Sequence, residues 1–474
     1  MTRSVLAALG VIAGVTLGLA GPPASAQTGG DDAPEVIAFR GEEMKVWPFE
    51  ELRRRGYDVV EPPREENAFW VCLEAINAYK DVPEELQEAF DYALTSSWPK
   101  GHDETLKSFL MDPANQQAMA AGRRAAKMET FQGYYFGDPK GSITSILLPS
   151  LSSHRQLCKL LVVDGRRLEA EGAYDRAFEN YVAAVRLGGH VGGGITLIEN
   201  LVGVACWSLG DRAACELALR EGISASQLRE IQKTLKELDA RRPTVERGLY
   251  YERIFGGGIV DEIVTKPTRL FQNLDSIGGM SGGYEINRED TGWEKLEARV
   301  GRLILPDRTI KQHFTEFYDR QYELTQHPLY SEMWRTFDEE KAVMAIPHWD
   351  IFARMLLPSL TRACVMSERL RTQSMLTRIA IALRLHMLEN KGQPAERLSS
   401  LDPAFAAEDL IDPFCGREFK YKVDGKGWLL YSVGENEVDD GGKSERPGSW
   451  RFDYVLQFPA PDVKPFEPTE TSDE

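Results

Sequence analysis

The sequence predicts a mainly helical protein, with a multi-helical, α-solenoid-like region followed by a small α+β module. Two patterns carry this prediction. Apolar residues recur at helical spacing through most of residues 67–390. Alternation with a period of two, which is typical of a strand, starts near the C-terminus at residues 419–423. A chain of 474 residues that is 42% hydrophobic is long enough for two or three domains with sizeable cores.

The first 26 residues have the features of a secretory signal peptide. Arg3 precedes an apolar run over residues 5–20, and Ala24 and Ala26 supply the small residues that signal peptidase recognises. An uncleaved membrane anchor is the alternative, but a spanning helix needs about 20 apolar residues, and this run is shorter and broken by glycines. We therefore expect an exported protein, periplasmic or extracellular, that begins at Gln27 and keeps no stable membrane anchor after cleavage.

The charge of the chain restricts its partners. The formal net charge is −17. Such a field repels phosphate backbones and anionic lipids, so we expect no binding to nucleic acid and favour a protein partner. The sequence leaves the oligomeric state open.

The six cysteines permit disulfides in an exported chain, but their surroundings favour free thiols. Cys206 and Cys215 lie in apolar, helix-like segments, where a cysteine usually acts as a small buried hydrophobic residue. No cysteine or histidine spacing is typical of a zinc site. We assign no pairing and expect buried thiols.

Residues 34–256 form the predicted helical domain. A helical pattern runs from Asn67 to Ala126, and helices are expected to start at Pro83 and at Asp112, where proline suits the first turn.

The second half of this domain contains a predicted helical hairpin. Gly172 allows a tight turn, and large and small residues then alternate on one helix face. Residues 158–187 resemble a single tetratricopeptide-type hairpin, without a second copy at that period. We expect the glycines of residues 188–194 to break the helix. Thr196 then begins the next helix through a Thr-x-x-Glu capping box.

Beyond the helical domain, residues 257–300 are glycine-rich and predict a linker or long surface loop. Helices return over residues 301–390. The longest is expected from about Leu356 to Leu388, because apolar residues form a continuous i, i+4 stripe there.

Residues 391–458 form the predicted C-terminal β module. Strands are expected at residues 419–423, 428–433 and 452–458, the first two joined by a turn. Residues 459–474 are rich in Pro, Glu and Thr, a composition that predicts a disordered tail.

Two motifs of this module resemble the C-terminal part of type II secretion major pseudopilins. They are Asp412-Pro413-Phe414 and Leu430-Tyr431-Ser432-Val433-Gly434, and the resemblance covers residues 372–442. It implies a helix packed on a small antiparallel sheet and a calcium ion in the acidic loop after the last strand. The long helix is internal and amphipathic here, unlike the filament-building helix of that family. The whole chain also resembles a group of uncharacterised exported bacterial proteins, a likeness that implies no activity.

The acidic loop is the one predicted metal site. By position, the resemblance implies Asp439 and Asp440 as calcium ligands, with Glu435 or Glu437 in addition. Calcium prefers six to eight oxygens on a flexible loop, and four acidic residues close to glycines supply such oxygens. A solvated acidic turn in an acidic protein is the alternative.

No residue is assigned a catalytic role. Ser281 lies in a G-x-S-x-G match, but the residues before it do not form the apolar strand that a nucleophile elbow requires. His190 lies beside glycines, and a helix break explains this pattern better than an oxyanion loop does. His386 is expected at the edge of the core.

The sequence therefore favours an exported, non-enzymatic interaction or structural scaffold protein, stabilised by calcium if the acidic loop binds it. Two alternatives remain open: a secreted hydrolase with a scattered active site, and an accessory of a type II secretion-like apparatus.

Overall fold

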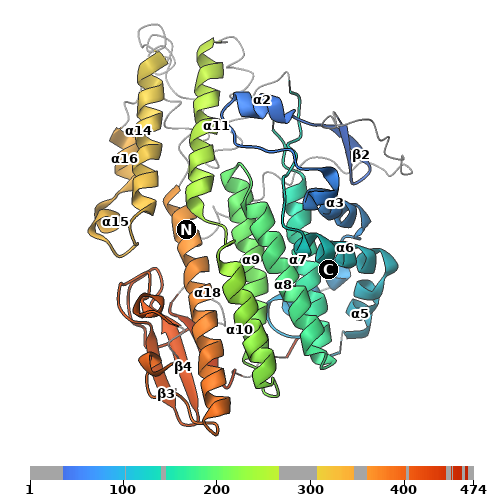
Figure 1. The fold of residues 1–474 in the computed structure, drawn as a ribbon, viewed down its shortest axis with the longest axis vertical. Coiled ribbons are helices and arrows are strands. Elements are labelled where there is room, and N and C mark those ends of the chain that lie inside the picture. Colours follow the sequence, from blue (N-terminus) through green and yellow to red (C-terminus); the bar gives the residue numbers. More distant parts are fainter. Residues whose placement is uncertain are drawn as a thin grey trace, which may run out of the picture.

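The protein is mainly helical, with a small antiparallel sheet near its C-terminus, as the sequence predicts (Figure 1). The computed structural model describes residues 36–101, 103–139, 143, 146–265, 307–345, 360–401, 405–444, 450, 452–461 and 465–467. The predicted signal peptide and Ser281 lie outside the described residues.

The N-terminal part packs several short helices and a two-stranded hairpin against the centre of the molecule. Its elements are β1 (Val36–Phe39), β2 (Glu42–Lys45), α2 (Phe49–Arg54), η2 (Arg64–Glu66), α3 (Ala68–Ala78), η3 (Glu84–Leu86), α4 (Gln87–Thr95), α5 (Asp103–Met111) and α6 (Pro113–Lys127). The hairpin has no counterpart in the sequence-based prediction.

Two of these helices begin as the sequence predicts. The side chain of Asp112 accepts a hydrogen bond from the Ala114 amide, and Pro113 occupies the first turn of α6. Asn67 caps α3 in the same way, by accepting from the Phe69 amide. Pro83 precedes the 3-10 turn η3, and α4 starts after that turn.

The centre of the molecule is a group of four long helices. They are α7 (Ser150–Ala170), α8 (Tyr174–Gly192), α9 (Leu197–Ala218) and α10 (Ala225–Asp239). Gly172 has a φ of 76°, which allows the tight turn between α7 and α8. The capping box of Thr196 and Glu199 is present at the start of α9.

The predicted helix break at residues 188–194 is placed too early, because α8 continues through Gly192. Its glycines have a packing role instead. A Cβ on Gly188 would lie 2.5 Å from the Trp207 amide nitrogen, and one on Gly203 would lie 2.5 Å from the nitrogen of Gly192. Helices α8 and α9 therefore approach so closely that only glycine fits at these positions.

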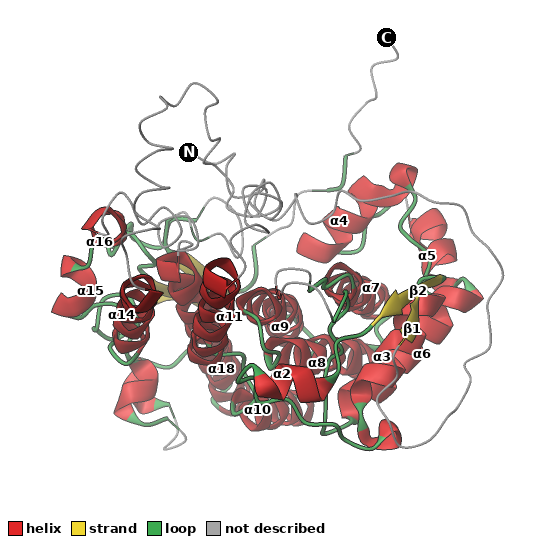
Figure 2. Ribbon diagram, turned by 90° about the horizontal axis from the view of Figure 1, so that it is seen from above, coloured by secondary structure: helices red, strands yellow, loops and turns green. Residues whose placement is uncertain are grey.

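The next helices extend the centre on one side (Figure 2). They are α11 (Val245–Thr265), α14 (Asp307–Thr325), α15 (Glu332–Thr336) and α16 (Glu339–Ala345). Residues 257–265 belong to α11, so the helix extends into the segment predicted as a loop. The rest of that segment lies outside the described residues.

The long helix α18 (Leu360–Glu389) carries the C-terminal module and confirms the predicted helix. The other elements are η6 (Leu398–Ser400), η7 (Ala407–Leu410), β3 (Lys420–Asp424), β4 (Gly427–Ser432) and β5 (Tyr454–Phe458). The strands form one antiparallel sheet in the order β3-β4-β5. Cys215 of α9 shares a hydrophobic cluster with α18 and the sheet, together with Leu219, the residue that follows α9. The module therefore packs directly on the helical region.

Asp412 explains why the two C-terminal motifs occur together. Its side chain is buried and accepts hydrogen bonds from the amides of Phe414 and Val433 and from the hydroxyl of Ser432, each at 3.0 Å. This carboxylate joins the Asp-Pro-Phe turn to the end of β4. The resemblance to pseudopilins remains a prediction.

The structure describes residues 465–467 of the predicted disordered tail. The ring of Phe466 packs against Tyr92 of α4, with ring centroids 5.2 Å apart. The chain thus returns from the sheet to the N-terminal helices. The part of the tail after residue 467 lies outside the described residues.

All six cysteines are free thiols, five of them buried. None of the helices in the described part of the chain combines the length and hydropathy that crossing a membrane requires.

Candidate functional site

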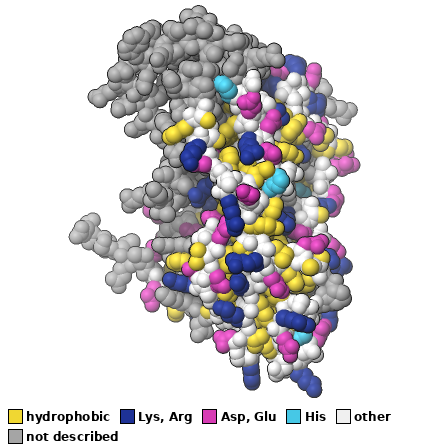
Figure 3. Space-filling view, turned by 90° about the vertical axis from the view of Figure 1, so that its left-hand side faces the viewer, with side chains coloured by type: hydrophobic (Ala, Val, Ile, Leu, Met, Phe, Trp, Pro, Cys, Tyr) yellow, Lys and Arg dark blue, Asp and Glu magenta, His cyan; other side chains and the backbone are white. Residues whose placement is uncertain are grey.

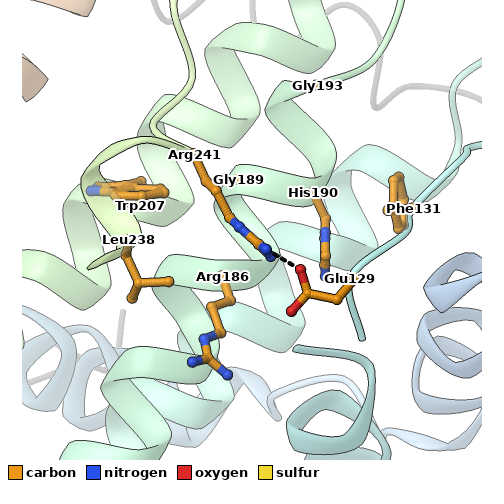
Figure 4. Close-up of a pocket in the computed structure, with 9 residues that line it drawn as sticks. All are labelled: Glu129, Phe131, Arg186, Gly189, His190, Gly193, Trp207, Leu238 and Arg241. Atoms are coloured by element: carbon orange, nitrogen blue, oxygen red, sulfur yellow. Dashed lines mark hydrogen bonds and ion pairs between the residues drawn. The ribbon is translucent and has the colours of Figure 1, made fainter. Parts of the chain in front are cut away.

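The candidate site is a cavity of about 400 Å³ on the surface of the central helices (Figure 4). Its walls come from the segment after α6, from α8 and α9, and from the end of α10. The lining residues are Glu129, Phe131, Arg186, Gly189, His190, Gly193, Trp207, Leu238 and Arg241. Small-molecule sites have volumes of roughly 300–1,000 Å³, so this cavity lies at the lower end of that range.

Two arginines and one glutamate supply the charges of the cavity. Arg241 reaches across to Glu129 and forms an ion pair with it (Figure 4). The side chains of Arg241 and Glu129 are 49% and 75% exposed, so the cavity opens to solvent. The Arg241 guanidinium holds the pKa of Glu129 below its usual value, and Arg186 adds to this effect. Within the described residues, the Arg186 side chain forms no hydrogen bond and no ion pair, and its charge acts on Glu129 at longer range.

Stacked rings form one wall of the cavity. The His190 ring lies parallel to Phe131, with centroids 5.5 Å apart and an interplanar angle of 13°. Behind this pair, His154 contacts Phe131 edge-on. Burial lowers the pKa of both histidines to about 4, so both are neutral at pH 7. His190 Nε2 lies 3.3 Å from the carbonyl oxygen of Ala125.

The opposite wall is the Trp207 ring, which packs on a helical glycine. A Cβ on Gly189 would lie 3.3 Å from this ring and 3.1 Å from the Arg241 carbonyl oxygen. The absence of a side chain at Gly189 therefore allows α9 and the end of α10 to approach α8. Leu238 completes the apolar surface on this side (Figure 4).

The lining of the cavity combines charged groups with aromatic and apolar surface. None of its nine residues is a serine, threonine, cysteine or lysine, so Glu129 and His190 are the nucleophiles that the lining offers. The His190 ring is partly buried and stacked on Phe131, and Glu129 is paired with Arg241. The His190 side chain belongs to the wall of a cavity, which the glycines around it did not indicate.

The structure places the four predicted calcium ligands beside basic or amide groups. Glu435 pairs with Arg369, and Glu437 pairs with Arg335. Asp439 lies 3.1 Å from Lys420 and accepts a hydrogen bond from Tyr431, whereas Asp440 accepts one from Asn436. Among the described residues, no three His, Cys, Asp or Glu side chains form a group that could hold a metal ion.

The calcium hypothesis predicts a measurable loss of stability on chelation. A bound ion stabilises the fold by roughly 3 kcal/mol when its concentration is about 100 times the dissociation constant. Thermal melting of the mature protein in calcium and in EDTA would then differ, and Asp439→Ala would abolish the difference. Identical melting curves, with Asp439→Ala equal to the wild type, would exclude calcium binding at this loop.

A second polar group, Glu199, is fully buried near the start of α9. It accepts hydrogen bonds from the hydroxyl and amide of Thr196 and from the Tyr135 hydroxyl. Gly194 leaves room for the carboxyl group, because a Cβ there would overlap it. Burial raises the pKa of Glu199 to about 7, from an ordinary value of 4.5.

We expect Glu199→Gln to change how stability depends on pH. A raised folded-state pKa means that the stabilisation by this group is complete below about pH 4.5 and is lost as the pH rises through 7. Relative to Glu199→Gln, the wild type should lose about 2–3 kcal/mol of unfolding free energy between pH 5 and pH 8. Urea unfolding at both pH values measures this difference. A gap between the two proteins that stays constant with pH would contradict the prediction.

Sequence reasoning missed most of the cavity. Its residues span positions 129–241 and come from four segments, so no local motif connects them. Arg186 and Arg241 are ordinary helix-surface residues in the sequence. Only the glycines around His190 stood out in the sequence. They predicted a break in the helix and not the wall of a cavity.

Comparison with known proteins gives no relative from which to transfer a function. No protein-family model, no curated protein and no solved structure matches the chain.

Proposed function

We propose that the chain is an exported, non-enzymatic scaffold protein whose helices form a rigid frame for a protein partner. The proposal rests on one observation, which is how the buried ionisable side chains are hydrogen-bonded and paired. In the described helical region several of these groups bond across helices, and these bonds hold the frame together.

The interface of α7, α8 and α9 contains the clearest example. Arg166 donates to Glu169 at 3.2 Å and pairs with Glu216 of α9. The hydroxyl of Tyr181, on α8, donates to Glu169 at 2.5 Å. Three helices therefore share one set of buried charges, which fixes their relative positions.

A second network joins the frame to the C-terminal module. Asp211 of α9 accepts hydrogen bonds from Gln373 and Thr377 of α18, each at 3.0 Å. Gln373 also bonds to both the side chain and the backbone of Ser208. These bonds hold α18, and with it the sheet, against the central helices.

The surface of this frame suits a protein partner. On the face formed by α14, α15, α18 and the C-terminal sheet, hydrophobic side chains lie among basic and acidic ones (Figure 3). Exposed hydrophobic residues of these and neighbouring segments include Tyr322, Met344, Val423 and Val438. A mixed surface of this kind is compatible with a protein interface, and it differs from the uniform basic patch of a nucleic-acid-binding protein.

The experiment compares binding with hydrolysis in the mature, exported protein. Chemical crosslinking in the native envelope, followed by capture, should give a defined partner, and Met344→Glu with Val423→Glu should reduce its recovery. Asp175→Asn, a change elsewhere on the surface, serves as the control. Hydrolysis of ester or peptide substrates that Ser281→Ala abolishes would overturn the proposal and favour the hydrolase. A partner from a secretion apparatus would specify the scaffold as an accessory of that machinery.

A further inference from the structure

We propose that the cavity between α8, α9 and α10 binds a small organic monoanion, a carboxylate attached to a flat apolar group. This inference is independent of the scaffold proposal, since the cavity and the mixed surface near the C-terminal sheet belong to different parts of the chain. It rests on the charges, the walls and the floor of the cavity.

The charges match one negative charge on the ligand. Arg186 and Arg241 each carry one positive charge, Glu129 carries one negative charge and His190 is neutral, so the net charge is +1. Arg241 already has a carboxylate partner in Glu129. Arg186 has no hydrogen-bond or ion-pair partner within the described residues, and its planar guanidinium is suited to bind a carboxylate with two hydrogen bonds.

The walls suit a flat apolar group. The parallel rings of His190 and Phe131 lie on one side, and the Trp207 ring lies on the other. Trp207 is 2% exposed and Leu238 is 5% exposed, so only an edge of each side chain reaches the cavity and both form its rigid base. An aromatic group on the ligand gains apolar burial and ring contacts at the partly buried His190 and Phe131 rings.

The floor disfavours phosphate. Phosphate sites commonly use free backbone amides at a helix N-terminus. Here the cavity lies at the C-terminal end of α8, and the amide of Gly193 already donates to the carbonyl oxygens of Gly189 and His190. The partial negative charge of this helix end weakens the site for a dianion more than for a monoanion.

The experiment measures the binding of 3-phenylpropionate to the mature protein by isothermal titration calorimetry. Its amide, 3-phenylpropionamide, has the same shape without the charge, and inorganic phosphate is the second probe. We expect the carboxylate to bind and the other two compounds to bind at least about tenfold more weakly, because charge-assisted hydrogen bonds are the stronger ones.

Three variants test the assignment of the charges. Arg186→Gln should weaken carboxylate binding about tenfold or more, whereas Glu129→Gln should strengthen it by releasing Arg241 from its partner. Arg320→Gln removes the same charge from α14, far along the chain, and should leave binding unchanged. Far-UV circular dichroism and the melting temperature confirm that each variant is folded.

Several results would overturn the proposal. These are no binding of the carboxylate to the wild type, equal binding of the amide, equal binding of phosphate, or equal losses in Arg186→Gln and Arg320→Gln. None of them changes the partner-capture result, so failure of this inference is distinguishable from failure of the scaffold proposal.

Discussion

Replacing Arg166 with methionine is expected to destabilise the protein by about 2–4 kcal/mol, since Arg220 still pairs with Glu169. The Arg166 side chain is 2% exposed and the Glu169 side chain 0% exposed, so the change leaves a buried carboxylate without one of its cations. Methionine keeps most of the volume of the arginine stem, which limits the contribution from lost packing. The midpoint of urea-induced unfolding, followed by near-ultraviolet circular dichroism, measures the loss.

An exposed arginine is the matched control for this change. Arg320 and Glu323 form an ion pair on α14 in which the side chains are 46% and 52% exposed. Solvent screens such a pair, so Arg320→Met should cost no more than about 1 kcal/mol. If Arg166→Met unfolds at the same urea concentration as Arg320→Met, the buried network does not hold the frame together.

Replacing Gly203 with alanine is expected to cost about 2–3 kcal/mol, although alanine is the better helix former. The added Cβ would overlap the backbone of Gly192 and lie 2.6 Å from the carbonyl oxygen of Gly188. Backbone atoms cannot move aside as a side-chain end can, so α8 and α9 would have to separate. The melting temperature and the urea midpoint should both fall.

Gly257→Ala provides a control with the opposite sign. Gly257 lies within α11, and a Cβ there would have no atom within 4 Å. Alanine should therefore stabilise the helix by up to about 1 kcal/mol. Equal effects of Gly203→Ala and Gly257→Ala would mean that close packing does not explain the glycines of α8 and α9.

Local patterns in the sequence predicted an element well where all the residues that form it lie within one short segment. The Thr196 capping box, the Asp112 start of α6 and the turn at Gly172 depend on residues within a few positions of each other. Alternation with a period of two marked β3, and the turn after it marked β4 as the return strand, for the same reason. The predicted helix break near Gly188 was wrong. The glycines there allow close packing against the neighbouring helix, and they do not interrupt their own helix.

The sequence by itself determined that this is a mainly helical protein with a small sheet near its C-terminus, because periodicity and capping are properties of neighbouring residues. Only the tertiary structure decided which helices meet and which side chains share a space. The cavity brings together Arg186, Trp207 and Arg241, and the buried network brings together Arg166 and Glu216. Both form through contacts between separate segments of the chain. Pairings at such sequence distances follow from packing in three dimensions, which no local pattern encodes.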